Sequence, residues 1–422
     1  MLVRSSIKLL QFYMPQDPQD SDSGEIMSLR EWRQAIRTPT TYRVGNRTLR
    51  IQTQFVSLVA FIGLVVLLVM YTYAVDHSTV SVESLKNKSS VKPYMPVPTT
   101  SSHDNYNSTY PLTTPKRTPK GILFRIGVVS DLDKGSRSKI EEFTWLSYYK
   151  KGSLLWNPVS KSIKVSWDAG DTTVLRSSIG ESGRGMELSE LVVFNGKLYV
   201  VDDRTGIIYE LLDDEVIPFV MLNDGDGRMN KGFKSEWAAV KDRKLFVGGL
   251  GKEWTTNTGE AVNTHPQWVK TVSPTGEVEH HNWYHKYLSV RRMLGIEFPG
   301  YITHEAVVWS DVHKCWFFLP RRCSKDSYND VLDETRGCNI MITADDTFTD
   351  IKVLHVGNLI PTHGFSSFKF IPGSSDQVIV ALRSEENKGA TATYIMGFDI
   401  MGKILLPETK IADEKYEGFE FI

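Results

Sequence analysis

The sequence is poor in cysteine and has almost no net charge. Its 422 residues include only three cysteines, and 49 Lys and Arg nearly balance 50 Asp and Glu. The three cysteines have no spacing that resembles a zinc site. A formal net charge of −1 argues against nucleic acid as a partner, because proteins that bind nucleic acid carry strongly basic surfaces.

Two common ligand-binding motifs are also missing. Residues 248–253 resemble a phosphate-binding loop, but Phe246 and Glu253 stand where Gly and Ser or Thr are required. Residues 224–227 resemble the start of an EF-hand loop, but Met229 occupies the position that needs glycine. We therefore interpret both segments as turns.

One long apolar run lies near the N-terminus. Residues 51–75 contain no charged side chain, and residues 56–75 alone supply the about 20 apolar residues that cross a bilayer. This predicts one transmembrane signal-anchor helix. A cleaved signal peptide is the alternative, but its apolar core is shorter and lies nearer the N-terminus.

The residues before this run are basic, and those after it are polar. Six arginines lie in the N-terminal segment close to the run: Arg30, Arg33, Arg37, Arg43, Arg47 and Arg50. By the positive-inside rule, residues 1–50 form a cytosolic tail, which we expect to be disordered, and the rest of the chain lies in the lumen. Residues 76–109 are rich in Ser, Thr, Pro and Asn and are predicted to form a stalk with glycosylation acceptors at Asn87 and Asn107.

Cys323 and Cys338 enclose a charged, turn-rich segment of the lumenal part. In an oxidising lumen, one expectation is a disulfide that closes this loop, and the other is a pair of free thiols.

A short pattern of Ser or Glu followed by strand-forming residues occurs five times within residues 110–422. The five positions are Ser189, Glu236, Glu305, Ser366 and Glu417. A second apolar run follows each of the first four, which is typical of one β-blade per repeat and predicts an all-β, five-bladed propeller. The last repeat ends with the chain, so we expect the strand-like run at residues 122–129 to complete its blade and close the ring.

These five positions predict a metal site. If each residue begins the innermost strand of its blade, five oxygen donors meet at the central axis, where they suit a hard cation. The three glutamates directly precede apolar runs, and a buried carboxylate needs a partner or a metal. The alternative is that the glutamates are solvated and the serines are turn residues.

Further carboxylates follow two predicted strands. Asp131 and Asp133 alternate after residues 122–129 and so point to one side, and Asp203 follows the run at residues 198–201. Each could bind substrate or metal, or could simply form an Asx turn.

Several segments closely resemble the calcium-activated nucleotidase (apyrase) family. They are residues 131–133, 150–152, 183–189, 201–206, 248–254, 361–370, 406–410 and 416–418. The resemblance spans essentially residues 108–422. It implies a five-bladed propeller with one central calcium ion, held at the same five positions that the repeat selects. It also places acidic substrate-site residues at Asp133 and Asp203, with Asp131 beside them.

The resemblance implies calcium-dependent hydrolysis of nucleoside diphosphates, and of some triphosphates, to monophosphate and phosphate. Similar membrane-anchored members prefer UDP and GDP and work in the endoplasmic reticulum or Golgi. There they support glycosylation by removing the UDP that glycosyl transfer releases. We also expect a type II membrane orientation, a cleaved or secreted form, and a homodimer.

Hydrolysis of a phosphoanhydride needs positive charge on the phosphate oxygens and an oriented water. Calcium could supply both, with Asp133 or Asp203 orienting or deprotonating the water. Candidate substrate ligands are Arg184, Lys252, Arg321, Lys369 and Arg383 for the phosphates, and Trp254 for the base. Two other functions remain open: a calcium-stabilised binding propeller (a lectin or scaffold), and a calcium-dependent hydrolase of esters or lactones.

Overall fold

The computed structural model describes residues 40–44, 47–51, 62–67, 70, 106–170 and 172–422. The chain divides into two compact units, Met1–Ser101 and Ser102–Ile422.

The first unit contains a short hairpin in the segment that was expected to be disordered. Strands β1 (Thr40–Val44) and β2 (Arg47–Ile51) pair in antiparallel fashion. Their β-branched and aromatic residues flank Gly45-Asn46, a pair that favours a two-residue hairpin turn, and this local signal explains the difference.

The predicted membrane span lies mostly outside the described residues, as does Asn87. Residues 62–67 are helical. Among the residues that the structure does describe, no helix has the length and apolar character needed to cross a membrane.

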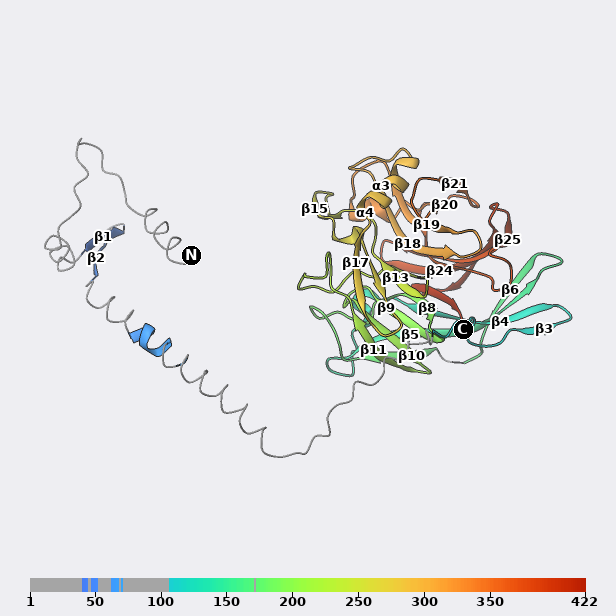
Figure 1. Cartoon of the computed structure of the whole chain (residues 1–422), viewed down its shortest axis with the longest axis horizontal. Coiled ribbons are helices and arrows are strands. Elements are labelled where there is room, and N and C mark those ends of the chain that lie inside the picture. Colours follow the sequence, from blue (N-terminus) through green and yellow to red (C-terminus); the bar gives the residue numbers. More distant parts are fainter. Residues whose placement is uncertain (1–39, 45–46, 52–61, 68–69, 71–105, 171) are drawn as a thin grey trace, which may run out of the picture. The chain divides into compact units, whose positions relative to one another are not determined.

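The second unit is a five-bladed β-propeller (Figure 1), as predicted. Four blades consist of four antiparallel strands in the order of the sequence, the first of which is innermost. Blade 1 contains β8 (Leu188–Phe194), β9 (Lys197–Asp202), β10 (Ile207–Leu212) and β11 (Glu215–Met221). Blade 2 contains β12 (Trp237–Lys241), β13 (Lys244–Gly248), β16 (Trp268–Val272) and β17 (Val278–Asn282).

Blades 3 and 4 repeat this arrangement. Blade 3 contains β18 (Tyr301–Ser310), β19 (Cys315–Ser324), β20 (Ile340–Asp345) and β21 (Ile351–His355). Blade 4 contains β22 (His363–Phe370), β23 (Val378–Asn387), β24 (Ala390–Asp399) and β25 (Ile404–Ala412).

Blade 5 closes the ring by joining the two ends of the unit. Its sheet has the order β26 (Tyr416–Phe421), β4 (Gly121–Ser130), β5 (Trp145–Asn157) and β6 (Ser162–Trp167). The C-terminal strand β26 pairs antiparallel with β4, with Gly418 opposite Val129 and Phe421 opposite Ile126. Two short strands extend this sheet, β3 (Lys116–Thr118) on β4 and β7 (Thr173–Ser177) on β5. The predicted closure is therefore confirmed.

Five hydrophobic clusters hold the blades together, one between each pair of neighbours. The cluster between blades 2 and 3 contains Trp237, Trp283 and Trp316, and the Trp283 and Trp316 rings lie 5.2 Å apart. Because successive strand residues face opposite neighbours, both faces of the inner strands are buried. This explains why these strands appear in the sequence as continuous apolar runs.

The remaining elements are short. They are the 3-10 helices η1 (Asp133–Ser136) and η2 (His265–Gln267), the helices α3 (Tyr284–Met293) and α4 (Asp330–Asp333), and the hairpin of β14 (Trp254–Thr255) and β15 (Ala261–Asn263). Cys323 and Cys338 form a disulfide across the loop between β19 and β20.

The propeller unit includes the last residues of the predicted stalk. The Tyr106 ring lies 5.8 Å from that of Phe194, and the Asn107 N–H donates to Asn195 Oδ1 at 2.8 Å. These contacts move the boundary of the unit from residue 110 to residue 106 or earlier. Glycosylation of Asn107, which is exposed, stays a prediction.

Candidate functional site

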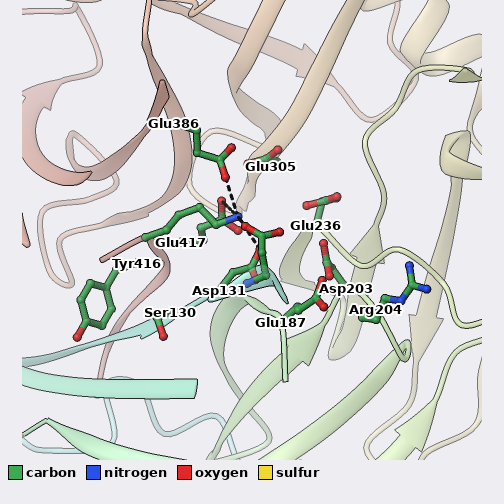
Figure 2. A network of polar contacts seen from close by, with 12 residues as sticks. Ser130, Asp131, Glu187, Asp203, Arg204, Glu236, Glu305, Glu386, Tyr416 and Glu417 are labelled. Carbon is green, nitrogen blue, oxygen red and sulfur yellow. Dashed lines mark hydrogen bonds and ion pairs between the residues drawn. The ribbon is translucent and has the colours of Figure 1, made fainter. Parts of the chain in front are cut away.

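The five predicted metal-binding positions lie on the innermost strands around the axis. Ser189 is in β8, Glu305 in β18, Ser366 in β22 and Glu417 in β26, and Glu236 directly precedes β12. Each inner strand contacts the inner strands of the next blades around the ring. Three of the carboxylates lie around a common centre in Figure 2, those of Glu236, Glu305 and Glu417.

A β-bulge lies at four of these positions. The pairing register shifts between Leu188 and Glu190, His304 and Ala306, Phe365 and Ser367, and Tyr416 and Gly418. The residue inside each shift is the predicted ligand. A bulge takes one residue out of the ladder and redirects its side chain, so the repeated bulge is the device that turns these residues toward the axis.

The three carboxylate donors are buried. The exposed fractions of Glu236, Glu305 and Glu417 are 3%, 7% and 3%. Burial raises the pKa of Glu236 to about 8, although Lys234 opposes the shift, and burial raises the pKa of Glu417 well above its usual range.

The two serines complete the same set. The hydroxyl oxygens of Ser189 and Ser366 are buried and have no hydrogen-bond partner among the described residues. Crowded carboxylates and unpaired hydroxyl oxygens form an oxygen-only donor set, which fits the coordination that calcium prefers.

Basic side chains border this ring. Arg321 donates to Glu305, Glu417 and Glu386, the last at 2.7 Å. Lys234 forms ion pairs with Asp203 and, at 2.9 Å, with Glu236.

Lys415 connects the ring to the carboxylates that follow β4. Its Nζ lies 2.7 Å from Asp131 Oδ2, 2.8 Å from Asp133 Oδ2 and 3.1 Å from Glu386 Oε1. The Asp131 carboxyl is buried, which would raise its pKa, but the Lys415 charge outweighs burial and the pKa is lowered.

Asp203 has a different environment from Asp131. Burial raises its pKa, with Lys234 opposing the shift, and its Oδ1 is buried without a hydrogen-bond partner. Asp133 lies in η1 with a positive φ of 48°, where its N–H donates to Asp131 Oδ1 at 2.7 Å. One oxygen from each of Asp131, Asp133 and Glu187 lies within 4.8 Å of the others.

These groups line one cavity of about 320 Å³. The predicted residues among its walls are Asp131, Asp133, Asp203, Glu236, Lys252, Trp254, Glu305, Arg321 and Glu417. The cavity therefore combines three of the five proposed metal ligands with further carboxylates and with basic side chains that could bind phosphate.

Comparison with known proteins agrees with this arrangement. The apyrase family matches residues 132–422. Soluble calcium-activated nucleotidase 1 of Rattus norvegicus is 57% identical over 317 residues, which cover 75% of this chain and 78% of the rat protein. Apyrase of Cimex lectularius is 43% identical over 384 residues, covering 91% of this chain and 100% of that protein.

The chain belongs to the apyrase family. It is therefore a hydrolase of nucleotide phosphates.

Two predicted phosphate ligands of this apyrase lie away from the cavity. Lys369 lines a separate cavity of about 600 Å³ and pairs with Glu190 Oε2 at 3.1 Å. It is three residues beyond Ser366 in β22, or roughly 10 Å along the strand, and the sequence could not show which end of the axis it faces.

Arg383 is buried inside blade 4 of the apyrase propeller. It donates to Glu408 Oε2 at 2.7 Å and to the His363 carbonyl at 2.9 Å. Its exposed fraction is 1%, and it holds strands together without lining the site cavity. Arg184 contacts the site indirectly, since its guanidinium lies 3.4 Å from Asp133 Oδ1.

The sequence analysis missed Lys234, Lys415 and Glu386. A signal for the two lysines was present: each stands two positions before a predicted metal-site glutamate, Glu236 or Glu417. Each lysine lies just before an inner strand and pairs with that glutamate, Lys234 with Glu236 at 2.9 Å and Lys415 with Glu417 at 3.6 Å.

Proposed function

We propose that this apyrase is a calcium-dependent nucleoside diphosphatase. The observation that carries the proposal is the repeated bulge that turns Ser189, Glu305, Ser366 and Glu417 toward the axis, where Glu236 joins them. The rat relative is named a calcium-activated nucleotidase, which supports calcium as the ion.

Calcium bound there would supply coordination sites for a phosphate oxygen and for the attacking water. The protein provides the remaining charge. Lys234, Arg321 and Lys415 line the cavity beside the proposed ligands and would bind the phosphate oxygens as charge develops on the leaving group. Lys252 is a further phosphate ligand in the cavity wall, and Trp254 would contact the base.

Asp203 is the better candidate for the general base. Its raised pKa lies nearer to neutrality than that of Asp131, which suits a group that accepts a proton from water. In the proposed step, the water oxygen bonds to the terminal phosphorus, the bridging P–O bond breaks, and Asp203 takes the proton. Asp133 and Asp131, fixed by Lys415, would orient the water.

We further propose that the apyrase faces the lumen of the endoplasmic reticulum or Golgi as a type II membrane protein that prefers UDP and GDP and removes UDP. The disulfide supports an oxidising compartment, and the two sequons support glycosylation. A secreted form and a homodimer stay predictions.

Phosphate release from UDP, with and without EGTA, tests the proposal. We expect release to stop without calcium, and Asp203→Asn to lose release while it still binds calcium in a titration. A binding propeller would release no phosphate under any condition. An ester hydrolase would cleave a phenyl ester in preference to UDP, and either result would contradict the proposal.

A further inference from the structure

The two serine ligands differ from the three carboxylate ligands in how their oxygens are held. The carboxylates pair with Lys234, Arg321 and Lys415. The hydroxyls of Ser189 and Ser366 are buried and make no hydrogen bond within the described part of the chain. The positions of these two oxygens therefore depend on the backbone of β8 and β22.

The residue that follows each serine is polar and fully buried, and the two side chains meet. Glu190 and Ser367 come directly after the bulges and are the first residues to pair again with the next strand. Ser367 Oγ donates to Glu190 Oε1 at 2.8 Å. This hydrogen bond joins the inner strands of blades 1 and 4, which are not neighbours, because the inner strand of blade 5 lies between them.

The strand between them takes part in the same contact. The Phe419 N–H of β26 donates to Glu190 Oε1 at 3.3 Å and to Ser367 Oγ at 3.2 Å. The Leu191 N–H donates to the same carboxylate oxygen at 2.9 Å. We call Glu190, Ser367 and the Phe419 N–H the axial clip. The axial clip connects the three inner strands that carry the proposed calcium ligands of blades 1, 4 and 5.

The other carboxylate oxygen of Glu190 has a different contact. Its Oε2 pairs with Lys369 Nζ at 3.1 Å, and Lys369 lines the second cavity. The two oxygens therefore have separable roles, since Oε1 joins strands and Oε2 balances a buried positive charge. A glutamine at position 190 would keep an acceptor for the first role and lose the charge for the second.

We propose that Glu190 is a positioning residue for the calcium site, and that it acts through the axial clip, which fixes the backbone at Ser189 and Ser366. This inference rests on the proposed function, because it takes calcium as the ion at the axis. A serine hydroxyl is a neutral ligand, so it contributes to binding only if the fold already holds its oxygen near the ion. Loss of groups that orient metal ligands lowers metal affinity by roughly 10- to 100-fold.

Two double variants separate the axial clip from the ion pair. Both contain Lys369→Met, which removes the buried positive charge, and replacement of a whole buried ion pair by apolar groups is often tolerated. Glu190→Gln/Lys369→Met keeps an acceptor for the clip and should bind calcium like the wild type. Glu190→Leu/Lys369→Met removes the acceptor, and we expect its calcium affinity to fall roughly 10- to 100-fold. Titration calorimetry without nucleotide measures the affinity, and chemical denaturation measures stability.

Ser367→Ala tests the axial clip from blade 4 and carries the test alone if the leucine variant does not fold. We expect its calcium affinity to fall roughly tenfold. Ser384→Ala is the matched control, because Ser384 in β23 is also fully buried and its hydroxyl has no hydrogen-bond partner among the described residues. It should bind calcium like the wild type.

A folded Glu190→Leu/Lys369→Met or Ser367→Ala variant with the calcium affinity of the wild type would overturn the inference, even if its stability fell. Equal losses of affinity in the glutamine and leucine double variants would also overturn it, because the ion pair would then be the cause. Failure of the proposed function would look different, since the wild type itself would bind no calcium or would release no phosphate from UDP.

Discussion

At the scale of single residues, the site depends on pairs of opposite charges that lie two residues apart, at or just before the start of an inner strand. Lys234 with Glu236, and Lys415 with Glu417, put a cation beside each proposed metal ligand. The glutamates were found from their place before apolar runs. The two lysines were not found. A lysine two residues before a glutamate indicates a shared site only when the strand that follows is known to lie at the axis.

The ammonium group of Lys252 predicts how substrate binding depends on pH. Burial lowers the pKa of its ammonium group to about 8. A lowered pKa means that the charge is present below about pH 8 and is lost as pH rises through that value, so phosphate binding should weaken there. We expect KM for UDP to rise between pH 7 and pH 9, measured as initial rates of phosphate release.

Lys252→Arg is the matched control for this prediction, because arginine keeps its charge over the same range. Its KM should be nearly independent of pH between 7 and 9. If KM for UDP rose equally with pH in Lys252→Arg and in the wild type, Lys252 would not be the group responsible for the rise.

At the scale of elements, the bulges could not have been predicted from the sequence. A bulge is a relation between two paired strands, and the sequence of β22 or β26 alone does not show where its register shifts. The pattern selected residues that lie together at the axis because the inner strands are apolar on both faces. The same pattern could not show that Arg321 lines the site cavity whereas Lys369 lines the other cavity.

Substitution of Gly418 tests whether the bulge in β26 fixes the position of the adjacent residue, Glu417. A Cβ at this position would lie 2.6 Å from Leu191 N and 2.7 Å from the Glu190 carbonyl carbon, which are backbone atoms of β8. We expect Gly418→Ala to reduce the free energy of unfolding by about 1–3 kcal/mol, through forced displacement of packed strands, and to weaken calcium binding. Chemical denaturation and calcium titration measure the two effects.

Gly135→Ala serves as the control for stability, since a Cβ at Gly135 would meet nothing within 4 Å. Equal stability and equal calcium binding of Gly418→Ala and the wild type would contradict this prediction, because the packed strands would then have to accept a displacement that their close contact excludes.

At the scale of the whole molecule, the first and last strands of the propeller share one blade. The sequence predicted this closure because the last repeat ends at Ile422 without outer strands, and the structure pairs β26 with β4. The contacts of Tyr106 and Asn107 with the propeller were missed, since both residues stand in a segment whose composition is that of a stalk.

Deletion of residues 418–422 should therefore prevent folding. It removes most of β26, uncovers the edge of β4, and takes Phe419 and Phe421 out of the cluster between blades 4 and 5. Circular dichroism of the purified propeller unit during heating would show no cooperative transition. A truncated protein that melts like the full unit would contradict the closed ring.

Calcium binding to the wild type and to Glu305→Gln, measured by titration calorimetry without nucleotide, tests the central claim most directly. The claim is that five axial oxygens hold the ion on which hydrolysis depends. We predict binding of one calcium ion by the wild type and an affinity lower by at least about tenfold in Glu305→Gln, because a carboxylate charge leaves the ligand set. Glu279→Gln, at an exposed carboxylate with 56% of its side chain accessible, should bind like the wild type. Equal calcium affinity in Glu305→Gln and the wild type would contradict the axial site.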